Sequence, residues 1–302
     1  MNFDAVCFGA LNMDRLYKVD RIAKEGEERM ITDFIESPGG SAANTAAGLA
    51  RLRVKTGFIG KVANDREGQL LLEDFRREGV DTNGIVVSSD GRSGSVMGYV
   101  DEKRERTLYV DPGVNDSLGF EEIDLEYAGS TKFLHLTSFV GDKPFTAQKR
   151  LVEALSGKGV KVSFDPGDLY ARKGLATLKP LVEKCFIVFP NESELKILTG
   201  EGYENGSKAL IRLGVSVVAV KLGGIGCYVT DGEESHLIEP YKVKVVDTTG
   251  AGDAFCTGFL YGLINNKGLR ECGKFGNFVA SRCITKIGAR NGLPKLSDLH
   301  SL

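Results

Sequence analysis

Beyond residue 131, short apolar runs alternate with segments of helical periodicity, and this alternation constrains the fold more than any other feature of the chain. A parallel strand reaches its neighbour only through a long crossover, which is usually a helix. The expected strands are KFLHLTSF (132–139), VKVSFDPG (160–167), CFIVFP (185–190) and VSVVAVKLG (215–223), and the expected helices cover 144–156, 174–184, 191–200 and 206–213. Because strands buried on both faces are apolar almost throughout, the pattern predicts a doubly wound α/β fold with a mostly parallel sheet flanked by helices.

The rest of the chain adds elements to this sheet. Further strands are expected at 4–11, 55–60 and 84–89, and further helices at 38–52, 66–78, 252–265 and 270–286. Residues 226–246 have the alternating pattern of two or three antiparallel strands at one edge of the sheet, the last ending at Val245 and Val246.

Two segments, 15–37 and 93–111, do not fit a buried sheet, because polar and apolar residues alternate along them. Each has a charged turn in its middle, AKEGEE at 23–28 and DEKRER at 101–106. We therefore predict one domain over residues 1–302, in which these inserted segments form a small β-sheet lid.

The composition is that of an ordinary globular protein, with 42% hydrophobic residues and a formal net charge of -2. No basic field exists to hold a nucleic acid, and no apolar run is long enough for a membrane span. The N-terminus lacks the basic region of a signal peptide, so we expect a cytoplasmic enzyme. The three histidines and six cysteines of the chain lack ligand spacing, so we expect no zinc site, and we predict no residue as a dedicated Mg²⁺ ligand.

A glycine-rich loop runs directly into a helix in DTTGAGDAFCTGFL, residues 247–260. Unpaired N–H groups at a helix N-terminus bind anions, above all phosphates. A carboxylate, Asp253, stands on the first turn of this helix, and its negative charge beside an anion site would be unfavourable unless it has a task. We interpret Asp253 as the group that takes a proton from a substrate hydroxyl while the loop holds a phosphoryl group.

Other polar groups occur where strands end and helices begin. Asn12 and Asp14 follow the first strand, at the end where open α/β sheets bind ligands, although a local turn explains them equally well. Gly39 and Gly40 lead into a helix that carries Asn44, whose amide suits a sugar hydroxyl; a capped helix with a glycine-rich start is the alternative.

Two further motifs are ambiguous when taken alone. Asn191 and Glu194 begin a helix just after a strand, and they could be a helix cap and nothing more. KLGGIG at 221–226 could be a simple turn between two strands. The chain lacks a Walker A motif and the HRD and DFG triplets of protein kinases. It also lacks the GxGxxG dinucleotide fingerprint, and this absence argues against an NAD-binding dehydrogenase.

Taken together, the motifs resemble those of the ribokinase-like PfkB carbohydrate kinases. The matching pieces are NMD (12–14), PGGSAANTA (38–46), GKVANDREG (60–68), FPNESE (189–194), KLGGIG (221–226) and DTTGAGDAF (247–255), which occur in the family's order along nearly the whole chain. The resemblance implies ATP-dependent phosphorylation, with Mg²⁺, of a hydroxymethyl group on a sugar or nucleoside.

The resemblance also implies roles for individual residues. Asp253 would be the catalytic base, with Gly250, Ala251 and Gly252 as the anion hole. The substrate would be held by Asn12, Asp14, Gly39, Gly40 and Asn44. The nucleotide would be bound by Asn191, Glu194, Lys221, Gly223, Gly226 and Asn277. A monovalent-cation loop, for K⁺, would map to Asp247, Thr249 and Gly288.

Some positions depart from the family pattern. Ser41 occupies a position that is lysine in ribokinases proper, and Lys221 stands where many relatives have threonine. The DPG at 165–167 resembles that of some nucleoside-phosphorylating relatives. The acceptor is thus expected to be a small sugar or sugar derivative, with a nucleoside as the alternative. The lid and the loops near Thr137, Ser138, Asp142 and Arg172 would shape its pocket.

A third hypothesis, which the intact Asp253 disfavours, is a ligand-binding homologue without catalysis. We also expect a homodimer, because apolar lid positions such as Phe34, Ile35, Val96 and Tyr99 require cover that a second lid could supply.

Overall fold

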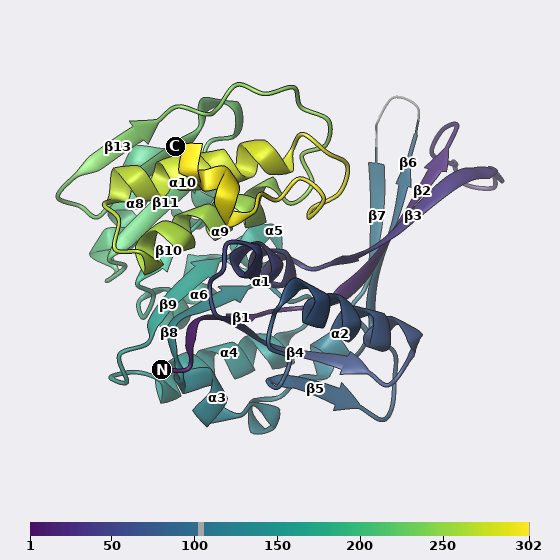
Figure 1. The fold of residues 1–302 in the computed structure, drawn as a ribbon, viewed down its shortest axis with the longest axis horizontal. Helices are drawn as coiled ribbons and strands as arrows, with labels where there is room; N and C mark the ends of the chain where they lie inside the picture. Colours follow the sequence, from purple (N-terminus) through teal and green to yellow (C-terminus); the bar gives the residue numbers. More distant parts are fainter. Residues whose placement is uncertain (102–105, 302) are drawn as a thin grey trace.

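The computed structural model describes residues 1–101 and 106–301 and contains two sheets of different size (Figure 1). The large sheet has nine strands in the order β13-β12-β11-β10-β9-β8-β1-β4-β5. Its strands are β1 (Phe3–Phe8), β4 (Thr56–Ala63), β5 (Ile85–Ser88), β8 (Thr131–Thr137), β9 (Lys161–Asp165), β10 (Ile187–Val188), β11 (Val217–Lys221), β12 (Cys227–Thr230) and β13 (Ser235–Ile238). All neighbours pair in parallel except β11 with β12 and β12 with β13.

Helices cover both faces of the large sheet. They are α1 (Ser41–Arg51), α2 (Arg66–Glu78), α3 (Leu125–Gly129), α4 (Asp142–Ala154), α5 (Gly167–Ala171), α6 (Leu175–Val182), α7 (Glu192–Thr199), α8 (Tyr203–Arg212), α9 (Ala251–Ile264) and α10 (Leu269–Cys283). Alternate residues of β1 show how the core divides: Val6 and Phe8 pack with α4 and α6, whereas Ala5 and Cys7 pack with α1 and α9. The predicted doubly wound architecture is confirmed.

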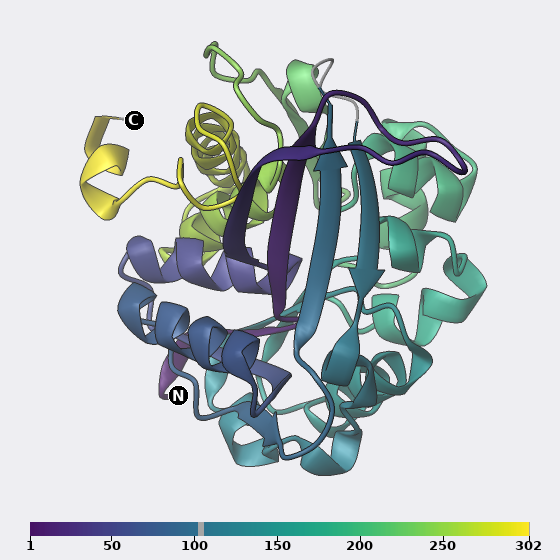
Figure 2. The ribbon, with the colours of Figure 1, turned by 90° about the vertical axis from the view of Figure 1, so that its right-hand side faces the viewer.

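The small sheet projects from one side of the large one (Figures 1 and 2). Its order is β3-β2-β6-β7, from β2 (Asn12–Val19), β3 (Ile31–Gly39), β6 (Gly94–Val100) and β7 (Arg106–Asp111). The turn predicted at 101–106 falls on residues 102–105, which lie outside the described part of the chain. The register of the small sheet places Asp14 opposite Val96, and it places Tyr17 opposite both Phe34 and Tyr99. Side chains of this sheet therefore point to two different faces.

One strand prediction was wrong. The chain leaves the large sheet after β13, and residues 239–246 form no strand. Pro240 lacks the N–H that a continuing ladder needs, and β13 remains the last strand of the sheet. The segment that carries Val243 and Val245 instead runs along a cavity. The irregular segment thereby supplies one wall of the candidate active site.

Candidate active site

Asp253 lies on the first turn of α9, immediately after the glycine loop. Gly250 caps this helix with φ 76°, and a Cβ at that position would lie 2.5 Å from Cβ of Ala289. Only glycine fits both the backbone conformation and the space. The helix N-terminus then directs N–H groups and the positive end of the helix dipole toward the site. The local fold has the features that an anion site requires.

Two cavities meet at Asp253. The larger, of about 730 Å³, lies between α9, α10 and the ends of β9, β10 and β11. The smaller, of about 320 Å³, lies between the small sheet and the C-terminal end of β1. Ser41, Ser138 and Asp253 line both cavities. Ala251 and Gly252, predicted for the anion hole, line the larger cavity, and Gly250 lines the smaller.

The carboxylate of Asp253 has defined partners. Nδ2 of Asn44 donates to Oδ2 of Asp253 at 2.8 Å, and Ser41 also forms a side-chain hydrogen bond with it. Burial raises the pKa of Asp253 to about 7, assisted by the negative charge of Asp165 and opposed by Asn44, Lys221 and Ser41. A carboxylate with this pKa can accept or release a proton near neutral pH.

Four of the residues expected to hold the substrate, Asn12, Asp14, Gly40 and Asn44, line the smaller cavity. Gly39 does not line it; a Cβ there would lie 2.1 Å from Oδ2 of Asp14, so the glycine makes room for that carboxylate. Burial raises the pKa of Asp14 to about 6, although the charge of Arg290 opposes the shift.

The smaller cavity also contains two residues that the sequence reasoning missed, Asn115 and Asp116. Asn115 bonds both the N–H and the carbonyl of Leu11 and donates to Oδ1 of Asn12 at 3.0 Å. Oδ1 of Asp116 and Oδ1 of Asp14 are buried and have no hydrogen-bond partner among the described residues. The signal in the sequence was the polar pair itself, which follows the expected lid segment 93–111 after the turn-forming Pro112 and Gly113.

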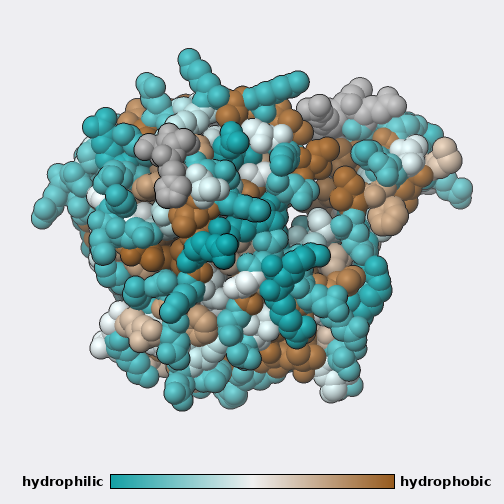
Figure 3. Space-filling view, viewed as in Figure 1, coloured by the Kyte–Doolittle hydropathy of each residue, from teal (hydrophilic) through white to brown (hydrophobic). Residues whose placement is uncertain are grey.

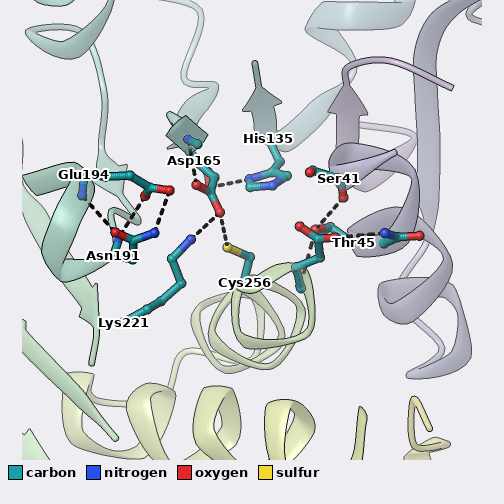
Figure 4. Close-up of polar contacts among 12 residues, drawn as sticks. Ser41, Thr45, His135, Asp165, Asn191, Glu194, Lys221 and Cys256 are labelled. Atoms are coloured by element: carbon teal, nitrogen blue, oxygen red, sulfur yellow. Dashed lines mark hydrogen bonds and ion pairs between the residues drawn. The ribbon is translucent and has the colours of Figure 1, made fainter. Parts of the chain in front are cut away.

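The larger cavity contains a buried ion pair between Lys221 and Asp165 (Figure 4). Nζ of Lys221 lies 2.6 Å from Oδ2 of Asp165, and the Sγ of Cys256 lies 3.4 Å from the same oxygen. Burial lowers the pKa of Lys221, but Asp165 and its other negative neighbours raise it more, so the ammonium stays charged. The same Nζ lies 3.4 Å from the place of a Cβ on Gly252, which puts this cation against the anion loop.

Asn191 and Glu194 form a capping box at the start of α7, and both also line the larger cavity. Oδ1 of Asn191 accepts from the N–H of Glu194 at 2.8 Å, and Oε2 of Glu194 accepts from the N–H of Asn191 at 2.7 Å. Burial and the charge of Asp165 raise the pKa of Glu194 to about 7 against the effect of Lys221. Asn191 and Glu194 therefore cap the helix, as the alternative interpretation had it, and they also line the larger cavity.

The remaining residues predicted for the nucleotide also line the larger cavity. Gly223 and Gly226 both have positive φ, and a Cβ on Gly226 would lie 2.0 Å from the carbonyl oxygen of Ile238. Nδ2 of Asn277 donates to the carbonyls of Ile238 and Glu239, each at 3.0 Å. Asn277 thus holds the irregular segment that follows β13.

Asp247, Thr249 and Gly288, predicted as a monovalent-cation loop, lie together beside the start of α9. Oδ1 of Asp247 accepts from the N–H and the hydroxyl of Thr249, at 2.9 and 2.7 Å, and its Oδ2 accepts from the N–H of Gly288 at 2.8 Å. The carboxylate therefore ties the glycine loop to the segment after α10.

The four loop positions expected to shape the pocket divide into two pairs. Thr137 and Ser138 line the larger cavity. Asp142 and Arg172 line neither of the two cavities and form exposed ion pairs with Lys173 and Asp168. Over the described residues, no cluster of three or more His, Cys, Asp or Glu side chains has the arrangement of a metal site, and no helix could span a membrane.

A doubly wound sheet with two cavities that share one carboxylate, one of them at a glycine-rich helix N-terminus, has the geometry that a two-substrate phosphotransferase with an alcohol acceptor needs. The family model for pfkB family carbohydrate kinases matches residues 2–296. The chain belongs to this family, whose members phosphorylate a sugar or a nucleoside, use ATP and generally require Mg²⁺.

Individual relatives agree with this assignment. The chain is 47% identical over 254 residues to an uncharacterized sugar kinase of Archaeoglobus fulgidus, covering 83% of this chain and 100% of the relative. It is 34% identical to an ATP-dependent ribose-1-phosphate kinase of Halopiger xanaduensis, covering 94% and 92%. The structure of Arabidopsis thaliana ribokinase complexed with ribose and ATP superimposes with a TM-score of 0.88 at 27% identity, covering 100% of this chain and 98% of that one.

Proposed function

We propose that the protein transfers the terminal phosphoryl group of ATP to a hydroxymethyl group of a small sugar or sugar derivative, with Asp253 as general base. The observation that carries this proposal is the position of Asp253, which lines both cavities and has a pKa raised by burial to about 7. The acceptor hydroxyl gives its proton to Asp253 as its oxygen bonds to the phosphorus, and the bond from phosphorus to the departing ADP oxygen breaks.

The smaller cavity suits the acceptor. Oδ1 of Asp14 and Oδ1 of Asp116, which are buried without partners among the described residues, can each accept a hydrogen bond from a hydroxyl. The opposite wall is apolar and includes Val96, Leu108 and Val110 from the small sheet, which suits the less polar face of a ring. We infer that this sheet acts as a lid that excludes water as a competing acceptor.

The larger cavity suits the nucleotide. Its donor side offers the N-terminus of α9 and the ammonium of Lys221, which can balance the charge of the transferred phosphoryl group. Gly223 and Gly224 would meet nothing within 4 Å of an added Cβ, so the backbone there is open to a ligand. Asn277 and the segment after β13 would lie beside the base and ribose.

The donor set of the larger cavity fits Mg²⁺ as the family uses it. Glu194 and Asp165 supply carboxylate oxygens, which this ion prefers, and a nucleotide would supply the rest together with water. Bound there, Mg²⁺ would neutralise charge on the phosphates. The loop of Asp247, Thr249 and Gly288 is proposed as the site of K⁺ dependence.

A nucleoside is the second candidate acceptor. The DPG sequence at 165–167 and the apolar wall of the smaller cavity both favour it. A coupled assay for ADP release over neutral sugars, ribose-1-phosphate and nucleosides tests the proposal. We expect one class to give acceptor-dependent ADP. ADP release independent of every acceptor would mean that water takes the phosphoryl group and would contradict the proposal, whereas no ADP release at all would support a ligand-binding homologue.

We further propose a cytoplasmic homodimer that forms through the lid. Phe34 stacks on Tyr17, which stacks on Tyr99, and Phe34 remains 57% exposed. Hydrophobic surface gathers over this sheet in Figure 3. The register places Ile35 and Val96 on the opposite, cavity-facing side, so the aromatic face alone would meet a second copy. Sedimentation at micromolar concentration should give a dimer that Phe34→Asp converts to a monomer; a wild-type monomer would refute the assembly.

A further inference from the structure

Arg290 lies buried behind Asn44 and lines neither cavity. Its side chain reaches back from the segment after α10 and contacts α1 and α2. Nε of Arg290 donates to Oδ1 of Asn44 at 2.8 Å, and its Nη1 donates to Oδ2 of Asp74 at 2.5 Å. All three residues are less than a tenth exposed. A continuous chain of hydrogen bonds thus runs from Asp74 through Arg290 and Asn44 to Asp253.

The chemistry of these groups fixes the direction of each bond. A guanidinium can only donate hydrogen bonds, whereas an amide side chain has one accepting and one donating end. Because Arg290 occupies the oxygen end of Asn44, the NH₂ end must face Asp253. A rotated amide would place its oxygen against a carboxylate oxygen and its NH₂ against a cation, and both contacts would be repulsive.

Arg290 is held in place through its backbone carbonyl by Arg51 and through its side chain by Asp74. Nη1 of Arg51 donates to the carbonyl oxygen of Arg290 at 2.5 Å, and Arg51 forms a two-point ion pair with Glu78 at 2.7 Å for each bond. Asp74 balances the buried charge of the guanidinium, which would otherwise be costly. The sequence gives Arg290 no motif, since it follows the matched segments and stands on a loop.

We propose that Arg290, held by Asp74, is a positioning residue for phosphoryl transfer that fixes the orientation of Asn44 and thereby the carboxylate of Asp253. This inference rests on the proposed role of Asp253 as the base. Its direct consequence is that the loss of Arg290 frees Asn44 to rotate. Asp253 then loses a donor that lowers its pKa, so the base should titrate at higher pH.

Other charged and titratable groups, from several elements, surround the series of hydrogen bonds that links Asp74 to Asp253. Those around Asp253 are Asp165 and Lys221, with the thiols of Cys256 and Cys283 nearby; those around Arg290 are Asp14, Asp74, Glu78 and Arg51. None of these residues is replaced in Arg290→Met, but the loss of the guanidinium charge also raises the pKa of Asp14, whereas Arg290→Lys keeps that charge. A matched control is Arg77→Met, because Nη2 of Arg77 also pairs with Asp74, at 2.6 Å, but is exposed and does not bond Asn44.

The test compares kcat, KM for ATP and the pH dependence of kcat in the full-length protein. We expect Arg290→Met to lower kcat roughly 10- to 100-fold, to leave KM for ATP within about twofold and to shift the acidic limb to higher pH. Arg77→Met should match wild type in all three. A folded Arg290→Met protein with native kcat and an unshifted limb would overturn the inference.

Arg290→Lys guards against a failure of the methionine variant to fold, because it keeps the buried charge beside Asp74. In a double-mutant cycle, the variant that combines Arg290→Lys with Asn44→Ala should have the same kcat as Asn44→Ala alone, since Arg290 acts through Asn44. Additive losses would contradict the inference. Asp253→Asn separates this inference from the proposed function: if that variant keeps native kcat, the base assignment fails, whereas a loss there with a native Arg290→Met refutes only the role of Arg290.

Discussion

Asn44 on α1 donates its amide N–H to the carboxylate of Asp253 on α9 at 2.8 Å, across a separation of 209 residues. The bond joins the helix that follows β3 of the small sheet to the helix that follows the glycine loop. It therefore couples the acceptor side of the proposed site to the anion loop. Formation of the catalytic arrangement requires both halves of the chain to be folded.

The pH dependence of turnover should follow the titration of Asp253. Its pKa is raised to about 7, and only the deprotonated form can take a proton from the acceptor. We therefore predict that kcat/KM for the acceptor falls about tenfold per pH unit below pH 7 and levels off above it. A rate that stays constant from pH 7 down to pH 5 would show that no such group is required.

The free energy of unfolding should change with pH in the direction opposite to turnover: it should fall as the pH rises. The folded protein retains the proton of Asp253 up to about pH 7, whereas the unfolded chain releases it near the ordinary value of 3.8. The folded state then binds more protons between these values, so the free energy of unfolding falls as the pH rises through this window. Asp253→Asn removes that penalty.

We expect Asp253→Asn to melt a few degrees higher than wild type at pH 8 and at nearly the same temperature at pH 4. Thermal unfolding at the two pH values measures this. A variant that is less stable than wild type at pH 8 would argue that the carboxylate is not destabilised by its surroundings.

Lys221 should matter for the transfer of the phosphoryl group. Its ammonium lies 2.6 Å from Asp165 and against the first turn of α9. We predict that Lys221→Met lowers kcat by roughly 10- to 1,000-fold, since it removes a preorganised cation from the anion loop. Steady-state kinetics with varied ATP measures the effect.

The matched control for that variant is Lys61→Met. Lys61 also forms a mostly buried ion pair, with Glu122 at 2.5 Å, and lines neither cavity. It should lose stability and retain kcat. Equal kinetic losses in the two variants would mean that the effect of Lys221 is structural.

Asp116 should contribute to binding of the acceptor. Its buried Oδ1 has no partner among the described residues, so an acceptor hydroxyl that donates to it would form a charge-assisted hydrogen bond. Asp116→Asn should raise KM for the acceptor about 10-fold and leave KM for ATP unchanged. Asp142→Asn, at an exposed carboxylate with an ion pair to Lys173, is the control and should change neither. A rise in KM for ATP alone would place Asp116 elsewhere in the mechanism.

Sequence periodicity was sufficient for the large sheet and its helices, because burial on both faces forces continuous apolar runs. It failed at 239–246, where alternating residues such as Lys242 and Val243 resemble a strand. Pairing also requires that the segment lie alongside a strand edge. Here Pro240 cannot donate to a ladder, and the chain leaves the sheet after β13. Pairing is a property of the neighbour as well as of the segment.

Motifs located most of the cavity lining but not the contacts behind it. Gly39 was expected to bring a ligand close to the backbone, and instead it accommodates the carboxylate of Asp14. Asp74 and Arg290 lie 216 residues apart and match no motif, so nothing local reveals their ion pair. Residues that orient a reacting group through another side chain are specified by tertiary packing, which spacing along the chain does not record.

The assignment of Asp253 as the base is tested most directly by the turnover of Asp253→Asn with the acceptor that wild type uses. Asparagine has nearly the same size as aspartate, and its side-chain oxygen can still accept the hydrogen bond from Asn44. It cannot accept the proton of the acceptor hydroxyl. We predict that kcat falls by about 10³-fold or more, while binding of a non-hydrolysable ATP analogue stays within about twofold. Turnover within about tenfold of wild type, with the analogue still bound, would contradict the central claim that Asp253 is the base.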